Sequence, residues 1–154
     1  MTKLLSIDSS TSSTGYAIFV DGQYSRSGCI DLKNIKNSTE RLSEMIRQLF
    51  LLIEKEKPDI VVAEEMVVAR NMKTSRFLIM ILGAVCGKCI DNNMFWYTLR
   101  PTEWRKLIPG EKPTGRDKLK TWSKETAKEM FGIEVNDDVS DAILVGQAYI
   151  NMWN

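Results

Sequence analysis

The sequence predicts an α/β protein built on a five-stranded mixed sheet with helices on both faces. Three strand-like segments come first, and the turn signal Asp21-Gly22 separates the second from the third. Two shorter apolar segments, residues 59–65 and 94–99, each follow a helical pattern. Strands joined by a tight turn run antiparallel, whereas strands reached through a helix run parallel to a neighbour. We therefore expect a three-strand meander followed by two crossover strands.

The first elements have clear local signals. Residues 3–8 form an apolar run that predicts a buried strand, and residues 36–59 have the apolar spacing of an amphipathic helix. Asn37 or Ser38 can cap the start of that helix, and Pro58 follows its end. The apolar side chains expected on its inner face are Leu42, Met45, Ile46, Leu49 and Ile53.

The second half of the chain alternates strands with helices. Residues 59–65 are rich in β-branched side chains and residues 94–99 in aromatic ones, so both predict strands. A largely apolar helix is expected from about 74 to 90, a charged helix from about 116 to 130, and a last helix over 137–153. The inner side of the last helix should carry Ala142, Val145, Ala148 and Tyr149.

The composition limits the function classes. With 154 residues, 44% of them hydrophobic and 27% charged, the chain fits one globular domain spanning residues 1–154. A net charge of +1 means that nucleic-acid affinity must come from local basic clusters. The chain has no His, the most common general base and zinc ligand. Its three Cys indicate reduced thiols in the cytosol, and its longest apolar run is too short to span a membrane.

Acidic side chains stand at the ends of three predicted elements. Asp8 ends the first strand, Glu64 and Glu65 end the fourth, and Asp138 and Asp141 lie one turn apart on the last helix. Clustered carboxylates repel one another until a cation neutralises them, and ligands that are all oxygen favour Mg²⁺ or Mn²⁺. Two such ions roughly 3.5–4 Å apart suit phosphodiester hydrolysis. The simpler interpretation of the helix acids is that they cap the helix and favour its dipole.

Three segments together resemble a known family. SIDSSTSSTGYAIF, VVAEEMVVARN and DDVSDAILVGQA are similar, in order and spacing, to RuvC-type Holliday junction resolvases of the ribonuclease H-like superfamily. The resemblance implies a ribonuclease H-like fold, with Glu64 rather than Glu65 in the site and Lys118 near the scissile phosphate. It implies catalytic, metal-binding carboxylates at Asp8, Glu64, Asp138 and Asp141, with two Mg²⁺ ions per site and Mn²⁺ as a substitute.

Basic residues gather beside the predicted site. Residues 66–90 contain Lys and Arg but no acid, and a basic loop beside an acidic metal site suits a phosphate backbone. The resemblance adds the segment after the fifth strand. Trp104 and Trp122 lie among its basic residues, where they could stack on bases, but we expect both in the core. The candidate DNA-binding residues are Arg70, Lys73, Arg76, Arg100, Arg105, Lys106 and Lys118.

Two features of the sequence bear on binding to a second copy of the chain and to DNA. The helix near residues 74–90 is apolar on more than one face, so it is either fully buried or meets a partner, and the resemblance implies a two-fold homodimer through it. Many family members place an aromatic side chain three residues after the catalytic Glu, where it stacks on bases near the junction. Val67 occupies that position here, with Met66 or Phe77 as candidate substitutes.

The predicted function is that of a Mg²⁺-dependent crossover junction endodeoxyribonuclease. It would resolve Holliday junctions, with flaps as a second candidate substrate, by paired hydrolysis that leaves 5′-phosphate nicks. One alternative is an actin-like or sugar-kinase-type ATP-binding domain, in which residues 9–15 cradle the ATP phosphates. Another is a non-catalytic protein that binds branched DNA. We expect a cytoplasmic protein of a bacterial or phage-infected cell, with no membrane partner.

Overall fold

A computed structural model of the chain describes residues 1–65 and 71–154. Its five-stranded sheet has the order β3-β2-β1-β4-β5. β1 pairs antiparallel with β2 and parallel with β4, so the predicted meander and the two crossover strands are confirmed. The strands are β1 (Lys3–Ser9), β2 (Ser13–Val20), β3 (Gln23–Asp31), β4 (Ile60–Glu64) and β5 (Phe95–Leu99).

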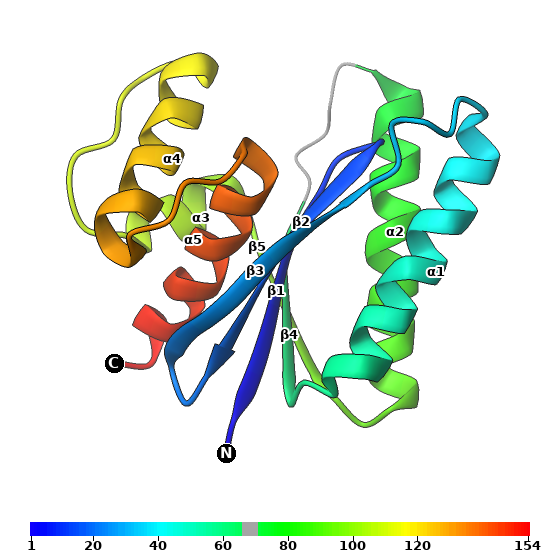
Figure 1. Cartoon of the computed structure of the whole chain (residues 1–154), viewed down its shortest axis with the longest axis horizontal. Helices are drawn as coiled ribbons and strands as arrows, with labels where there is room; N and C mark the ends of the chain where they lie inside the picture. The colour runs from blue at the N-terminus through cyan, green and yellow to red at the C-terminus, as the bar shows by residue number, and fades with distance from the viewer. Residues whose placement is uncertain (66–70) are drawn as a thin grey trace.

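Helices cover both faces of the sheet, as predicted. In Figure 1, α1 and α2 lie on one side of the strands, and α3, α4 and α5 lie on the other. The short helix α3 was not predicted as a separate element. The helices are α1 (Ser38–Glu56), α2 (Met72–Asp91), α3 (Pro101–Leu107), α4 (Arg116–Phe131) and α5 (Asp137–Met152). In the part of the chain that the structure describes, none of them is long and apolar enough to cross a bilayer.

Strand alternation divides the interior into two cores. Successive side chains of a strand point to opposite faces, so Leu4 packs in the core under α5 and Leu5 in the core under α1 and α2. Val62 and Val61 of β4 divide in the same way. Of the inner positions predicted for α1, Met45, Leu49 and Ile53 are fully buried and Leu42 and Ile46 partly so, and all four predicted on α5 are buried.

Local backbone geometry explains where the elements turn. Asp21 and Gly22 both have positive φ angles, 50° and 77°, which is the pattern of a type I′ turn between β2 and β3. Asn37 caps α1 by accepting a hydrogen bond from the backbone nitrogen of Glu40. Lys57, with φ of 47°, ends α1 directly before Pro58.

A glycine lets the sheet and α5 approach closely. Gly15 on β2 lies opposite Asp8 on β1, and a Cβ atom built at Gly15 would lie 2.1 Å from the carbonyl oxygen of Asp138. Only a residue without a side chain fits between β2 and the first turn of α5. Ser6 adds a hydrogen bond of 2.6 Å from its Oγ to the carbonyl oxygen of Ala142. These contacts fix the start of α5 over the end of β1.

We predict that Gly15→Ala destabilises the protein by about 2–3 kcal/mol, because the added methyl group must push α5 from the sheet. The measurement is the midpoint of urea unfolding. Gly87→Ala is the matched control, since Gly87 lies within α2 with open space around it and Ala favours helix. Equal midpoints for wild type and Gly15→Ala would contradict the close approach of α5 to Gly15.

Candidate active site

Strand alternation places two acids on one face at one end of the sheet. Ile7 of β1 lies beside Ala63 of β4 in parallel register, and both belong to the core under α1 and α2. The next residues, Asp8 and Glu64, therefore point to the opposite face, toward α5. The side chain of Asp8 is only 8% exposed. Two adjacent parallel strands thus deliver their carboxylates to the same place.

The third acid comes from the first turns of α5. Asn136 caps this helix by accepting a hydrogen bond from the backbone nitrogen of Val139, and Asp141 lies just beyond the first turn. One carboxylate oxygen from each of Asp8, Glu64 and Asp141 lies within 4.8 Å of the others. Three of the four predicted carboxylates are thus brought together.

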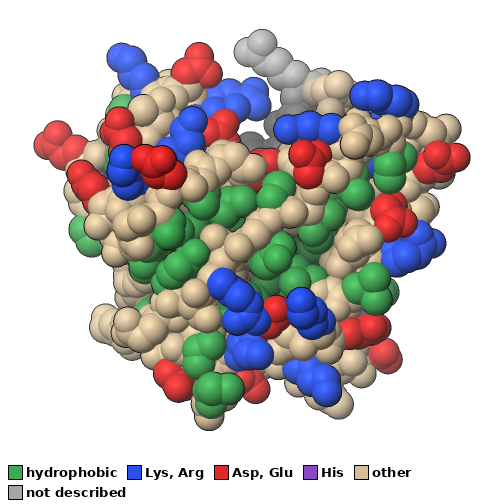
Figure 2. Space-filling model, in the orientation of Figure 1, with side chains coloured by type: hydrophobic (Ala, Val, Ile, Leu, Met, Phe, Trp, Pro, Cys, Tyr) green, Lys and Arg blue, Asp and Glu red, His purple; other side chains and the backbone are tan. Residues whose placement is uncertain are grey.

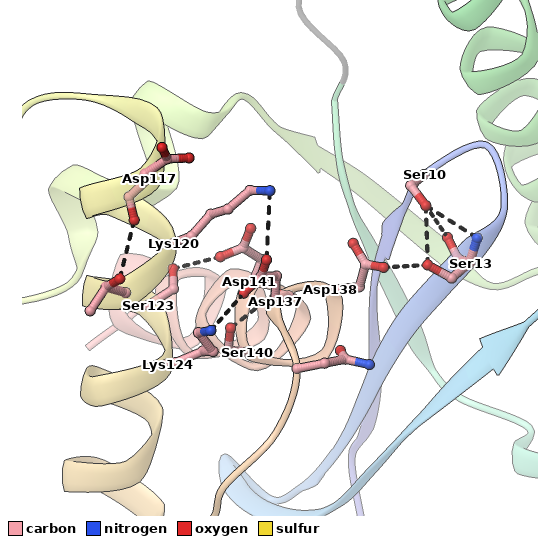
Figure 3. A network of polar contacts seen from close by, with 12 residues as sticks. Ser10, Ser13, Asp117, Lys120, Ser123, Lys124, Asp137, Asp138, Ser140 and Asp141 are labelled. Atoms are coloured by element: carbon pink, nitrogen blue, oxygen red, sulfur yellow. Dashed lines mark hydrogen bonds and ion pairs between the residues drawn. The ribbon is translucent and has the colours of Figure 1, made fainter.

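The fourth predicted carboxylate, Asp138, lines the same cleft but stands outside that group. Its Oδ2 accepts a hydrogen bond from the Oγ of Ser13 on β2. In Figure 3 the Asp138 side chain reaches from α5 toward Ser13, while Asp141 lies on the side of Ser123. The Ser-rich stretch after Asp8 therefore holds Asp138.

Two further side chains hold the clustered acids in place. The indole Nε1 of Trp104 on α3 donates to Oε2 of Glu64 at 2.7 Å. The Oγ of Ser123 on α4 donates to Oδ1 of Asp141 at 2.5 Å. Each bond engages one oxygen of its carboxylate and leaves the other oxygen for a cation. Trp104, Ser123 and Ser13 were not predicted as part of the site, because each is close only in the folded chain.

The neighbouring acid Glu65 lies apart from the cluster. Its Oε2 accepts a hydrogen bond of 3.1 Å from Thr98 on β5. Glu64 and Glu65 are consecutive, so the pleat sends their side chains to different faces. The placement agrees with the preference for Glu64 that the sequence resemblance suggested.

The clustered carboxyl groups hold protons more tightly than isolated ones. Burial, reinforced by the charges of Glu64 and Asp141, raises the pKa of Asp8 well above its ordinary value. Burial raises the pKa of Glu64 to about 7, against a lowering by the Trp104 hydrogen bond, and that of Asp141 to about 6, against a lowering by Ser123. The positive charge of Arg105 lowers all three pKa values.

A cleft of about 870 Å³, lined by both acidic and basic side chains, opens over these acids. Figure 2 shows Lys and Arg side chains on both sides of a hollow at this end of the molecule. The guanidinium of Arg105 lies over the Trp104 ring, 5.1 Å from its centroid. Lys120 and Lys124 pair with Asp137, the first residue of α5, at 3.6 and 3.2 Å. The basic residues that line the cleft are Lys33, Arg105, Arg116, Lys120 and Lys124.

The helical period explains which residues of α4 face the cleft. Arg116, Lys120 and Lys124 are spaced by four, so they share one face of α4. Lys118 is turned by about 200° from Arg116 at about 100° per residue. It is exposed and lines a separate depression with Asp117 and Trp122. The four-residue spacing in the sequence was the signal that could have singled out Lys120 and Lys124.

The other predicted DNA-binding residues have varied positions. Arg105 lines the cleft. Lys73 and Arg76 are exposed on the first turns of α2, and Lys106 is exposed on α3. Arg100 caps α3 and pairs with Glu103 at 2.8 Å. Arg70, with Val67 and Met66, lies outside the described residues, and Phe77 is half-buried on α2.

The donor set fits a hard divalent cation. Three partly buried carboxylates lie within 4.8 Å of one another. Burial is the main cause of their raised pKa values, and neighbouring negative charges add to it. A divalent ion removes the repulsion and accepts oxygen ligands from all three. The structure therefore supports a divalent metal site formed by Asp8, Glu64 and Asp141.

Comparisons with known proteins agree with this geometry. Residues 4–148 match the family model for crossover junction endodeoxyribonuclease RuvC. The RuvC protein of Caldicellulosiruptor saccharolyticus is 30% identical over 96% of this chain and 92% of its own length. The RuvC protein of Halorhodospira halophila is 29% identical over 93% of this chain and 86% of its own.

Solved structures share the fold. The structure of Thermus thermophilus RuvC with a Holliday junction substrate superposes with a TM-score of 0.77 at 11% identity, covering 99% of this chain and 95% of that one. The Fowlpox virus resolvase with Holliday junction DNA gives a TM-score of 0.68 at 16% identity, covering 99% of both chains. At these identities the likeness shows the fold alone.

We predict that the metal-free protein loses stability as pH rises from 5 to 8. The folded pKa of Glu64 is about 7, above its ordinary value of 4.5, so folded molecules keep a proton that unfolded chains have released. That contribution is complete below about pH 4.5 and is lost as pH passes about 7. The measurement is the urea midpoint in EDTA across this range. Glu64→Gln should lose less stability than wild type, and an equal or steeper loss in the variant would contradict the prediction.

Proposed function

The chain belongs to the RuvC family of crossover junction endodeoxyribonucleases, and from this membership we propose how it cuts DNA. The observation that carries the proposal is the group of three carboxylates at the floor of a cleft lined by basic side chains. The acids suit a divalent ion and the basic side chains suit phosphates. The substrate is a Holliday junction, cut by hydrolysis of phosphodiester bonds.

We propose that Asp8, Glu64 and Asp141 hold one Mg²⁺ ion and that Asp138 helps to hold a second, with Mn²⁺ as a substitute. Bound at these carboxylates, the ions supply Lewis-acid activation of water and stabilise the oxygen that leaves. Water adds its oxygen to phosphorus, the bond to the 3′ oxygen breaks, and the products are a 3′-hydroxyl and a 5′-phosphate. No His is present, so the proton of the water passes to solvent or to a carboxylate.

The chain's own cations would position the DNA. Arg105, which lines the cleft next to the carboxylates, would pair with the scissile phosphate. Lys33 and Arg116 line the same cleft and would contact the neighbouring backbone. Lys120 and Lys124 pair with Asp137 and remain partly exposed, so they can exchange that partner for phosphates. The exposed Lys73, Arg76, Arg100, Lys106 and Lys118, together with Arg70, are proposed to contact DNA farther from the cut.

The outer side of α2 supports a homodimer. Ile79 is 58% exposed on this helix, and such apolar exposure indicates a surface that a partner covers. A two-fold dimer would present one active site to each of two symmetric strands of a junction. The other exposed apolar residues on this helix are Met72, Met80 and Ile90.

The alternatives receive less support. An ATP-binding domain of the actin-like or sugar-kinase type is not favoured, since the family match spans the chain and the stretch after Asp8 holds α5 through Ser13. A non-catalytic binder would not need three partly buried acids so close together. We propose one nuclease domain over residues 1–154, acting on DNA in the cytoplasm of a bacterial or phage-infected cell.

We predict paired, symmetric nicks in a synthetic four-way junction with Mg²⁺, and none with EDTA or with Asp8→Asn. Labelled junction, flap, duplex and single-stranded DNA are incubated with both proteins, and the products are resolved by denaturing electrophoresis. Ligation of the nicks by a DNA ligase tests for the 5′-phosphate. Gel-shift binding by Asp8→Asn is the control for folding.

The substrates separate the alternatives. Equal cutting of flaps and junctions keeps the mechanism and broadens the substrate class. Junction binding without any cutting in Mg²⁺ or Mn²⁺ would overturn the enzyme and support the non-catalytic binder. Absence of DNA binding together with ATP binding would support the phosphate-loop alternative.

We predict that Ile79→Glu converts the dimer to a monomer and weakens paired cutting, because it places a charge in the apolar contact of α2. Sedimentation velocity measures the mass of each protein at matched concentrations. Leu51→Glu is the matched control, since Leu51 is 51% exposed on α1. A wild-type protein that sediments as a monomer would contradict the proposed dimer.

A further inference from the structure

We propose that Trp104 is a positioning residue for the metal site, whose indole N–H fixes the carboxylate of Glu64 in the orientation that the ion requires. The inference rests on the proposed function, since it takes Glu64 to be a metal ligand. Trp104 is completely buried, and its Nε1 lies 2.7 Å from Oε2 of Glu64. It touches the ligand and would not touch the ion.

Glu64 needs such a hydrogen-bond donor because the negative charges of the neighbouring carboxylates repel its own. It is the last residue of β4, and its long side chain faces the like charges of Asp8 and Asp141. Without a restraint, rotation about the side-chain bonds would carry the carboxylate toward solvent. A hydrogen bond from a neutral donor to a carboxylate is charge-assisted, so it holds the anion without adding a competing positive charge.

The indole is well suited to a fixed direction. An indole nitrogen only donates, so its bond with a carboxylate cannot reverse, unlike the hydroxyls of Ser13 and Ser123. The Trp104 ring stacks on Trp122 of α4, with centroids 6.2 Å apart and planes inclined by 24°. The guanidinium of Arg105 covers part of the same ring. Packing therefore fixes the ring, and the ring fixes Glu64.

The hydrogen bond to Glu64 should also make the indole N–H signal of Trp104 sensitive to metal binding. A cation bound to Glu64 draws electron density from its carboxylate and weakens the hydrogen bond from the indole N–H to Oε2. The chemical shift of the indole proton should therefore change. The chain has four Trp, so four indole signals are expected in a proton–nitrogen correlation spectrum. Only the Trp104 signal should shift strongly when Mg²⁺ is added. A side chain that merely filled the core would show no such response.

The test compares Trp104→Phe with Trp122→Phe. The first removes the N–H while keeping an aromatic ring, and the second alters the same stacked pair but leaves the bond to Glu64 intact. Calorimetric titration with Mn²⁺ should show about tenfold weaker binding for Trp104→Phe, the usual scale for losing a hydrogen bond to a metal ligand. Trp122→Phe keeps an aromatic ring against Trp104 and leaves the indole N–H in place, so it should bind Mn²⁺ as wild type does.

A double-variant cycle confines the effect to Glu64. In a Glu64→Gln background, Trp104→Phe should cause little further loss of Mn²⁺ affinity, because both changes act on the same ligand. Equal Mn²⁺ affinity in wild type and Trp104→Phe would overturn the positioning role, as would an indole signal unmoved by Mg²⁺ in the wild type. The second readout needs no variant and decides even if Trp104→Phe does not fold.

Different results would overturn the positioning role of Trp104 and the proposed nuclease function. A wild-type protein that binds Mn²⁺ and cuts junctions, with an unaltered Trp104→Phe variant, overturns the role of Trp104 alone. A wild-type protein that binds no Mn²⁺ and cuts no DNA overturns the proposed function, and the positioning role with it.

Discussion

The gathering of three carboxylates in a partly buried site is the constraint on which the rest of the structure depends. Asp8, Glu64 and Asp141 come from three elements, and one oxygen of each lies within 4.8 Å of the others. Nothing about the acids themselves brings them together, so the surrounding fold must supply the free energy. Two hydrophobic cores, one on each face of the sheet, provide it. Burial and clustering of the carboxylates cost part of that stabilisation, and a bound cation would offset the cost.

Three donors from three different elements each hold one carboxylate of the site, that of Asp138, Glu64 or Asp141. Ser13 on β2 binds Asp138, Trp104 on α3 binds Glu64, and Ser123 on α4 binds Asp141. Each carboxylate is therefore linked to a part of the fold other than its own element. These hydrogen bonds between elements keep the side chains in place before any ion or substrate binds. The short helix α3 contributes twice, since Arg105 follows Trp104 and brings a positive charge to the same acids.

Sequence alone predicted the acids because their signals are local. Asp8 and Glu64 stand at the ends of apolar strands, and Asp141 lies in a recognisable helix start. The donors were missed because a buried Trp or Ser looks like core until the fold shows its neighbour. The helix α3 was missed because it is only seven residues long and begins at Pro101, which fits a loop equally well. Lys118 was chosen by family resemblance, whereas the helical period of α4 points Lys120 and Lys124 toward the cleft.

The docking of α5 on the sheet has a consequence for the order in which the protein folds. Asp8 and Asp141 are separated by more than a hundred residues of the chain. Gly15 and Ser6 of the sheet contact a helix that lies far along the chain. Contacts of such sequence separation form late in folding. The carboxylate cluster is therefore completed in a late step of folding, when α5 docks on the sheet.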